Sequence, residues 1–263
     1  MQTAPDNPPV IRSREGAVLT LLLNAPANRN SLSAPGMLEG LLAGLDELDA
    51  DPDLRALVIG GAGGTFCSGG DLRLLAESSE PDIRTRMNQG AWLYRRIALS
   101  DKQVIAAVEG AAFGAGLGLA CCCDFVVAAR NARFCCAFVR VGAMPDAALF
   151  WSLPARVGLP KARRMMLFAE EIAGTDALGI GLADELAEAD GALCAAQALA
   201  ARLAHGPARA HARIKAGLRR APMEIEDALA YQLDNAPGLF ASADFREGAA
   251  AFFEKRKPVF RGA

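Results

Sequence analysis

The hydrophobic pattern up to about residue 205 predicts strands and helices in alternation. Short apolar runs bounded by glycine or polar residues indicate buried strands, and apolar residues at helical spacing indicate amphipathic helices. The predicted strands are 18–23, 54–59, 104–108 and 125–128, and the predicted helices are 32–48, capped by Ser33, 83–99, a segment through Ala120, and 150–157. This alternation predicts an α/β fold in which each crossover covers the sheet.

The pattern changes at about Pro207. Helical stretches rich in alanine, arginine and leucine replace the strand patterns, and 208–220 is amphipathic and basic. We therefore expect a core over residues 10–205 and a helical region over 206–263, which packs on the core or on a neighbouring subunit.

The composition is that of a globular protein. The chain has 263 residues, 52% of them hydrophobic, and a formal net charge of −2. This near-neutral charge argues against a nucleic-acid binder, which is normally strongly basic. The longest uncharged apolar stretch, 110–123, is too short to span a membrane. Residues 1–9 lack the apolar segment of a signal peptide and are expected to form a frayed tail.

Cysteine and histidine usage narrows the chemistry. Five of the seven cysteines form the runs 121–123 and 135–136, which lack the C-x-x-C spacing of a zinc site. We expect small buried side chains, no bound metal and a reducing, cytoplasmic location. The two histidines, His205 and His211, lie in an alanine- and arginine-rich stretch, which argues against a metalloprotease site or a Ser-His-Asp triad.

Two glycine-rich loops each follow a predicted strand. They cover 65–72 and 113–118, and the second opens a helix. Small residues there let a ligand approach backbone N–H groups, and the helix adds the positive end of its dipole. The pair could form an oxyanion hole, or the glycines could serve tight turns alone. A dinucleotide fingerprint is incomplete because Leu119 replaces its third glycine, and no G-K-[ST] marks a P-loop.

Four sequence blocks, in order, resemble the crotonase (enoyl-CoA hydratase/isomerase) superfamily across residues 18–260. Residues 23–32 resemble L-N-x-P-x-x-x-N-[AS]-L, 66–72 resemble F-[CS]-[AS]-G-x-D-L, 108–116 resemble V-x-G-x-A-x-G-G-G, and 252–260 resemble F-x-E-K-R-K-P-x-F. The resemblance implies a spiral of ββα turns with C-terminal trimerisation helices, and a homotrimer or dimer of trimers. It also implies an acyl-CoA thioester as substrate, with coenzyme A as part of that substrate and no separate cofactor.

The resemblance assigns roles to particular positions. The backbone N–H groups of Ser68 and Ala115 correspond to the oxyanion-hole donors, which hold the thioester oxygen as it becomes an enolate. Asp71 corresponds to a residue that braces the loop. The implied substrate and coenzyme A contacts are Arg29, Gly69, Gly70, Asp71, Leu72, Phe138, Met144 and Lys257, with Lys257 contributed by a neighbouring subunit.

The chain departs from the family pattern at the hydratase acids. Gly118 and Phe138 stand where hydratases carry two glutamates, one to deprotonate water and one to protonate the α-carbon. Asp146 is the next candidate, because 142–151 resembles the G-x-x-P-D segment of isomerases, including dienoyl-CoA isomerases and the ring-opening isomerase of phenylacetate degradation. Ala148 and Leu149 replace glycines usual there. Asp146 could instead cap the following helix.

These observations leave several functions open. The leading hypothesis is an isomerase in which Asp146 moves a proton between carbons of the enolate, since one carboxylate suffices to shift a double bond. A divergent hydratase, a non-catalytic acyl-CoA-binding scaffold and, more remotely, a dinucleotide oxidoreductase are the alternatives. The candidate apolar residues for an acyl pocket are Met87, Trp92, Phe138, Met144, Phe150 and Trp151. Glu109, Asp124 and Glu171 match family positions that are usually structural.

Overall fold

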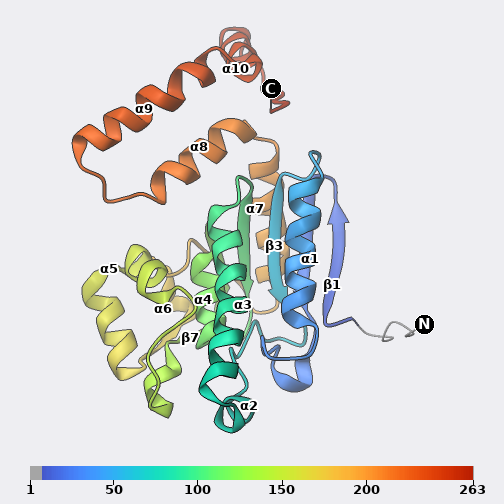
Figure 1. Cartoon of the computed structure of the whole chain (residues 1–263). Helices are drawn as coiled ribbons and strands as arrows, with labels where there is room; N and C mark the ends of the chain where they lie inside the picture. The colour runs from blue at the N-terminus through green and yellow to red at the C-terminus, as the bar shows by residue number, and fades with distance from the viewer. Residues whose placement is uncertain (1–7, 263) are drawn as a thin grey trace.

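The computed structural model describes residues 8–262 and is built around a six-stranded sheet with the order β1-β2-β3-β4-β6-β9 (Figure 1). The β1–β2 pair is antiparallel and the other pairs are parallel. The strands are β1 (Val10–Glu15), β2 (Val18–Leu23), β3 (Ala56–Gly61), β4 (Gln103–Val108), β6 (Phe125–Ala129) and β9 (Glu185–Ala187). The frayed tail predicted for residues 1–9 lies mostly outside the described residues.

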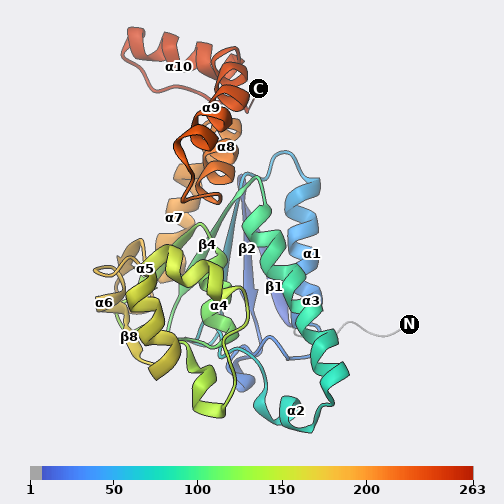
Figure 2. The same ribbon diagram turned by 60° about the vertical axis from the view of Figure 1, so that its left-hand side comes forward.

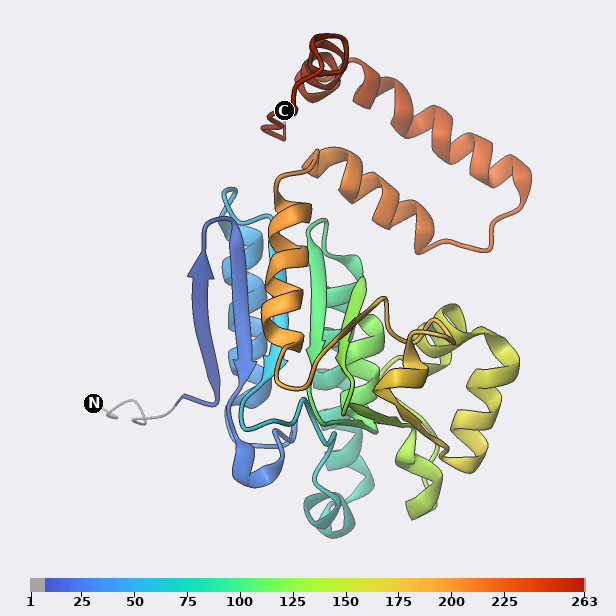
Figure 3. The same ribbon diagram turned by 180° about the vertical axis from the view of Figure 1, so that it is seen from behind.

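Helices cover both faces of this sheet. Helices α1 and α3 lie on one face, and α7 lies on the other, as the view from behind shows (Figure 3). The helices of this part are α1 (Met37–Ala50), α2 (Leu72–Glu77), α3 (Glu80–Leu99), α4 (Ala115–Cys122), α5 (Leu149–Phe168, kinked at Gly158), α6 (Gly174–Ala177) and α7 (Ala192–Ala204). All six residues of β4 are buried, as expected for a parallel strand covered on both faces.

A smaller sheet packs beside the larger one. It has the order β5-β7-β8, with β5 (Ala111–Phe113), β7 (Arg133–Cys135) and β8 (Glu171–Ala173). Two short 3-10 helices, η1 (Pro26–Asn28) and η2 (Ala137–Val141), lie in connections. Strands and helices alternate along the chain, so the predicted α/β class is confirmed.

The predicted elements are found with shifted boundaries. The strand predicted at 18–23 matches β2, whereas β1 and the short strands were missed because they lack a clear apolar pattern. Helix α1 begins at Met37, after Gly36, so the predicted cap by Ser33 is wrong. The Ser33 hydroxyl instead accepts the Asp71 N–H at 3.1 Å, which ties the segment just after the first family-like block, 23–32, to the glycine loop.

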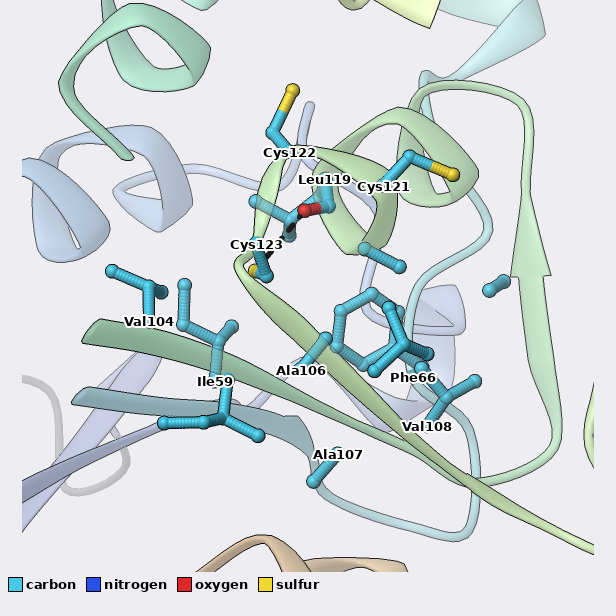
Figure 4. Packing of buried hydrophobic residues seen from close by; sticks show 14 of the residues in the cluster. Ile59, Phe66, Val104, Ala106, Ala107, Val108, Leu119, Cys121, Cys122 and Cys123 are labelled. Carbon is cyan, nitrogen blue, oxygen red and sulfur yellow. Dashed lines mark hydrogen bonds between the residues drawn. The ribbon is translucent and has the colours of Figure 1, made fainter. Parts of the chain in front are cut away.

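The cysteine runs lie in the core, as predicted. Figure 4 shows Cys121, Cys122 and Cys123 at the end of α4, with Cys123 on the side of Val104 and Ile59 and its Sγ donating to the Leu119 carbonyl at 3.3 Å. Burial raises the pKa of Cys121 and of Cys122 to about 12, so both thiols stay protonated. Cys194 is the exposed exception.

The last three helices stand at the end of the sheet where the parallel strands begin (Figures 1 and 2). They are α8 (Ala208–Leu218), α9 (Ile225–Phe240) and α10 (Ala243–Glu254). Lys215 of α8 reaches into the core and pairs with Asp124 at 2.7 Å. Within the described chain, no helix is both long and apolar enough to cross a membrane.

Candidate active site

The two glycine loops lie against each other, as the oxyanion-hole interpretation of the sequence requires. Cys67 N–H donates to the Ala111 carbonyl at 2.9 Å, and Phe113 N–H donates to the Cys67 carbonyl at 3.0 Å. Gly69 has φ +91°, and a Cβ there would lie 2.9 Å from the Ala115 nitrogen. Only glycine permits this approach, which brings the segment after Ser68 beside the start of α4.

The two predicted oxyanion donors, the backbone N–H groups of Ala115 and Ser68, differ in their hydrogen bonds within the protein. Ala115 is the first residue of α4, and its N–H has no protein acceptor within residues 8–262. Such an N–H at a helix start is free for an external oxygen. Ser68 N–H donates to the Arg29 carbonyl at 3.0 Å. A thioester oxygen could therefore take the Ala115 N–H directly, but must share or displace the Arg29 carbonyl at Ser68.

A cavity of about 800 Å³ runs along α3 and contains several predicted site residues. Gly70, Ala115, Asp146, Met87 and Trp151 line it. Tyr94, which the sequence analysis did not single out, also lines it and is only 7% exposed. The cavity thus joins the start of α4 to the Asp146 segment.

Asp146 has an unpaired buried oxygen. Its Oδ1 makes no hydrogen bond within the described residues, and burial raises the pKa of its carboxyl. Burial raises the pKa of the neighbouring Tyr94 hydroxyl well above its usual value, with a further contribution from the charge of Asp146. An unpaired carboxylate oxygen in an apolar surrounding is costly, so this site is suited to an external partner.

The alternative role of Asp146 as a helix cap is wrong. Helix α5 begins at Leu149, its N-cap residue is Ala148, and no side chain caps it. Asp146 contributes its backbone carbonyl, which accepts the Leu149 N–H at 3.0 Å. Within residues 8–262, no hydrogen bond from another residue accounts for the position of the carboxylate.

The backbone after Asp146 is strained. Ala147 and Ala148 have φ of +52° and +57°, in the left-handed region that non-glycine residues rarely adopt. Such strain is held in place by surrounding structure and is frequent at functional sites. The position of the left-handed turn, one residue earlier than the glycines expected at 148 and 149, lets Leu149 enter α5 as a buried residue.

Position 118 has no room for a side chain in this structure. A Cβ at Gly118 would lie 2.5 Å from the Cβ of Ala147. The Asp146–Ala148 segment thus occupies the space that a side chain at 118 would need. Phe138 is partly buried and lies 3.9 Å from where a Cβ of Gly114 would be, which is van der Waals contact.

A shallow groove of about 420 Å³ brings together other predicted contacts. Its lining includes Arg29, Ser68, Gly70, Asp71 and Leu72. Arg73 also lines it, and the sequence analysis missed this residue. The Asp71 carboxylate accepts the N–H groups of Arg73 at 2.9 Å and Leu74 at 3.4 Å. Asp71 is therefore the N-cap of α2, with its carboxylate bound to the start of that helix.

Four predicted contacts, Gly69, Phe138, Met144 and Lys257, lie outside both hollows in this chain. Phe138 packs under the start of α4, Met144 is 71% exposed, and Lys257 is exposed after α10. Neither Phe138 nor Met144 lines the cavity in the single chain, so their assignment to the acyl pocket stays a prediction. Trp92 and Phe150, also candidates, are largely exposed and do not line it.

Three other carboxylates have structural partners. Glu109 accepts the Ala192 N–H at 2.7 Å at the start of α7. Asp124 pairs with Lys215, and Glu171 accepts from Arg140 at 3.2 Å. These partners agree with the structural roles expected for them.

Comparison with known proteins identifies the family. Residues 13–263 match the family model described as enoyl-CoA hydratase/isomerase. A probable enoyl-CoA hydratase of Rhodobacter capsulatus is 40% identical, with 94% of each chain covered. The 1,2-epoxyphenylacetyl-CoA isomerase of Escherichia coli is 34% identical over 94% of this chain and 96% of the relative. An enoyl-CoA hydratase structure from Polaromonas sp. JS666 has a TM-score of 0.91 at 34% identity, with 96% of this chain and 99% of that chain covered.

Proposed function

Because this chain belongs to the enoyl-CoA hydratase/isomerase family, we propose that it is an enoyl-CoA isomerase that moves a double bond through a thioester enolate. The observation that carries the proposal is the unpaired Asp146 Oδ1 in the cavity that also holds the free Ala115 N–H. Among the described lining residues, the other carboxylate is Glu39, which is exposed on α1. One isolated carboxylate suits proton transfer between two carbons of one substrate.

The proposed reaction begins with the thioester oxygen on the Ala115 N–H. The Ser68 N–H joins as second donor when the oxygen displaces the Arg29 carbonyl. As the Asp146 carboxylate removes a proton from the α-carbon of a 3-enoyl-CoA, the electron pair moves into the thioester and forms a dienolate. Asp146 then returns the proton at the γ-carbon, which gives the conjugated 2-enoyl-CoA. No other reactant is consumed.

The surroundings of Asp146 favour this role. A raised pKa makes its carboxylate a stronger base than an exposed aspartate. Backbone donors fixed in a water-poor site stabilise the enolate without reorganisation, which is usually the largest catalytic contribution. The relative named 1,2-epoxyphenylacetyl-CoA isomerase supports isomerase chemistry on a similar chain.

The test is the conversion of 3-hexenoyl-CoA to its conjugated isomer, followed by absorbance. We expect Asp146→Asn to lower kcat at least about 100-fold, the usual effect of removing a general acid–base group. Asp53→Asn, an exposed aspartate remote from the cavity lining, is the matched control. Full activity of Asp146→Asn would overturn the proposed mechanism.

A divergent hydratase is the second candidate, because the relative from Rhodobacter capsulatus is named a probable enoyl-CoA hydratase. Hydration of crotonyl-CoA, measured as loss of the conjugated thioester absorbance, would favour it. A third outcome is tight acyl-CoA binding without exchange of the α-proton in deuterated water, which would indicate a non-catalytic binding protein.

We also propose that the chain assembles as a homotrimer or dimer of trimers, in which Lys257 of one subunit meets the coenzyme A phosphates of another. Large apolar side chains of α8, α9 and α10, such as Leu218, Leu233 and Phe252, are exposed in the single chain. Covering such a surface in an oligomer removes it from water. Sedimentation measurements give the subunit number, and a fall in coenzyme A affinity of Lys257→Ala tests the shared contact.

A further inference from the structure

The cavity continues beyond Asp146 along α3 and reaches a cation. Tyr94, near Asp146, and Ala98, one helical turn or about 6 Å further along α3, both line it. Arg219, which follows α8, also lines the cavity, and its Nη1 donates to the Ala98 carbonyl at 3.2 Å. The guanidinium therefore lies about one turn of α3 past the proposed reacting position.

Arg219 retains most of its hydrogen-bonding capacity. The side chain belongs to a partly buried residue and makes no ion pair within residues 8–262. The bond to Ala98 uses one of five N–H donors. A guanidinium presents its donors as a planar fork that matches the two oxygens of a carboxylate.

The surroundings strengthen this preference for an anion. Trp151 and Leu99 add apolar surface to the cavity lining. Arg86 and Arg95 also line the cavity, so it holds three arginines against the two carboxylates Glu39 and Asp146. An acyl chain ending in a methyl group would leave the Arg219 donors without a new partner.

We propose that the cavity binds acyl-CoA thioesters whose acyl chain ends in a carboxylate, and that Arg219 receives this carboxylate. The inference rests on the proposed function only in taking the Ala115 and Asp146 end of the cavity as the thioester end. It assigns Arg219 as a substrate-specificity residue and dicarboxylic acyl-CoA esters as the substrate class.

The test is a binding comparison that needs no turnover. Dissociation constants are measured by calorimetry for adipyl-CoA and hexanoyl-CoA, and for suberyl-CoA and octanoyl-CoA, which differ in the terminal group at equal carbon number. We expect the wild type to bind at least one carboxylate-ended ester about tenfold more tightly than its methyl-ended partner, as one charge-assisted hydrogen bond supplies. The preference should shrink as salt is added.

The variants separate recognition from structural support. Arg219→Gln should remove the preference, Arg219→Lys should keep part of it through its charge, and Arg163→Gln, exposed on α5, should retain it. Equal weakening of both esters by Arg219→Gln would mean that Arg219 only holds the end of α3, and would overturn the proposal. The proposal would also be overturned if the wild type bound the methyl-ended esters as tightly as the carboxylate-ended ones.

The two proposals fail separately. A carboxylate preference lost in Arg219→Gln, without isomerisation of any 3-enoyl-CoA, would uphold the Arg219 site and overturn the isomerase function. Isomerisation of 3-hexenoyl-CoA without any carboxylate preference in binding would uphold the isomerase function and overturn the Arg219 site.

Discussion

Asp124 and Asp146 are both withdrawn from water, yet they lie in opposite chemical situations. The Asp124 carboxylate follows α4 and accepts Lys215 Nζ at 2.7 Å and the Val104 N–H at 2.8 Å. Asp146 precedes α5, and its Oδ1 has no partner in the described chain. Burial raises the pKa of both carboxyls, but at Asp124 the Lys215 ammonium opposes this effect.

The difference separates a structural carboxylate from a functional one. At Asp124 the fold supplies a cation and a backbone donor, so the carboxylate ties α8 to the end of the sheet. At Asp146 the fold supplies a cavity and strained flanking residues instead. Burial and a raised pKa are common to both sites, so the presence or absence of partners distinguishes the roles.

The largest loss of stability is expected from removing the Lys215 ammonium that pairs with Asp124. Lys215→Met leaves the buried Asp124 charge with only the Val104 N–H and the nearby Arg156 to stabilise it, and should lower the free energy of unfolding by about 3–5 kcal/mol. The side chains of Lys215 and Asp124 are 5% and 17% exposed, so water cannot replace the pair. Urea denaturation measures the loss.

The matched control removes both charges. Asp124→Leu combined with Lys215→Met should recover most of the stability, because two apolar side chains can replace a buried ion pair at little net cost. An unchanged urea midpoint for Lys215→Met alone would show that the Lys215–Asp124 pair does not contribute to stability. Asp124 would then not be the structural carboxylate of the comparison.

The next effect tests the unpaired N–H beside Asp146. Ala115→Pro removes that donor at the first position of α4, where a helix tolerates proline because the N–H makes no helical bond. We expect kcat to fall about 10²–10³-fold, as for other oxyanion-hole donors. Ala115→Gly keeps the N–H and is the control. Near-wild-type turnover by Ala115→Pro would remove this amide from the mechanism.

A smaller effect is expected on stability at Asp146. Its folded-state pKa is raised above the ordinary value of 3.8, so its contribution is intact below that pH and is lost as the pH rises through the folded pKa. Asp146→Asn, which stays neutral, should therefore have a higher Tm than the wild type at pH 7.

The difference in Tm should diminish as the pH falls toward 4, where the wild-type carboxyl regains its proton. Asp53→Asn, at an exposed position, should show no such trend. A wild type that is more stable than Asp146→Asn at pH 7 would mean that the carboxylate has a stabilising partner, contrary to the comparison.

The smallest effect concerns Glu247, a partly buried carboxylate with partners. Arg256 and the Val259 N–H lower the pKa of Glu247 to about 2. A lowered folded-state pKa means that the stabilisation is present above the ordinary value of 4.5 and is lost as the pH falls toward 2. Glu247→Gln should lower Tm less than Asp146→Asn raises it, because solvent screens ion pairs at the surface. A Tm difference independent of pH would contradict this account.

The sequence predicted the site residues that lie in short motifs and missed those that do not, because a motif is a local feature of the chain. The loop pattern around Ser68 and Ala115 is contained in short segments, so the meeting of these loops could be inferred from motifs. Tyr94 and Arg219 carry no motif, since a lone tyrosine on a helix and a basic residue near the chain end are usually structural or solvated. Only their common position in the cavity distinguishes them.

The position of a residue in a motif does not give the direction of its side chain. Met144 precedes Pro145 and Asp146 in sequence, yet it is exposed while Asp146 lines the cavity. Neighbours in an irregular segment point in different directions, and the left-handed residues Ala147 and Ala148 set that path. The sequence offers no periodicity from which to infer such directions.

The sequence by itself determined the α/β class, the family, the facing glycine loops, and the absence of glutamates at 118 and 138. Each of these depends on local periodicity or on residue identity within a short segment. Tertiary structure alone decided that Asp124 is paired and Asp146 is not, that the Ser68 N–H is occupied by Arg29, and that Arg219 faces the cavity. These facts depend on distances between residues far apart in the chain, which only the packed fold brings together.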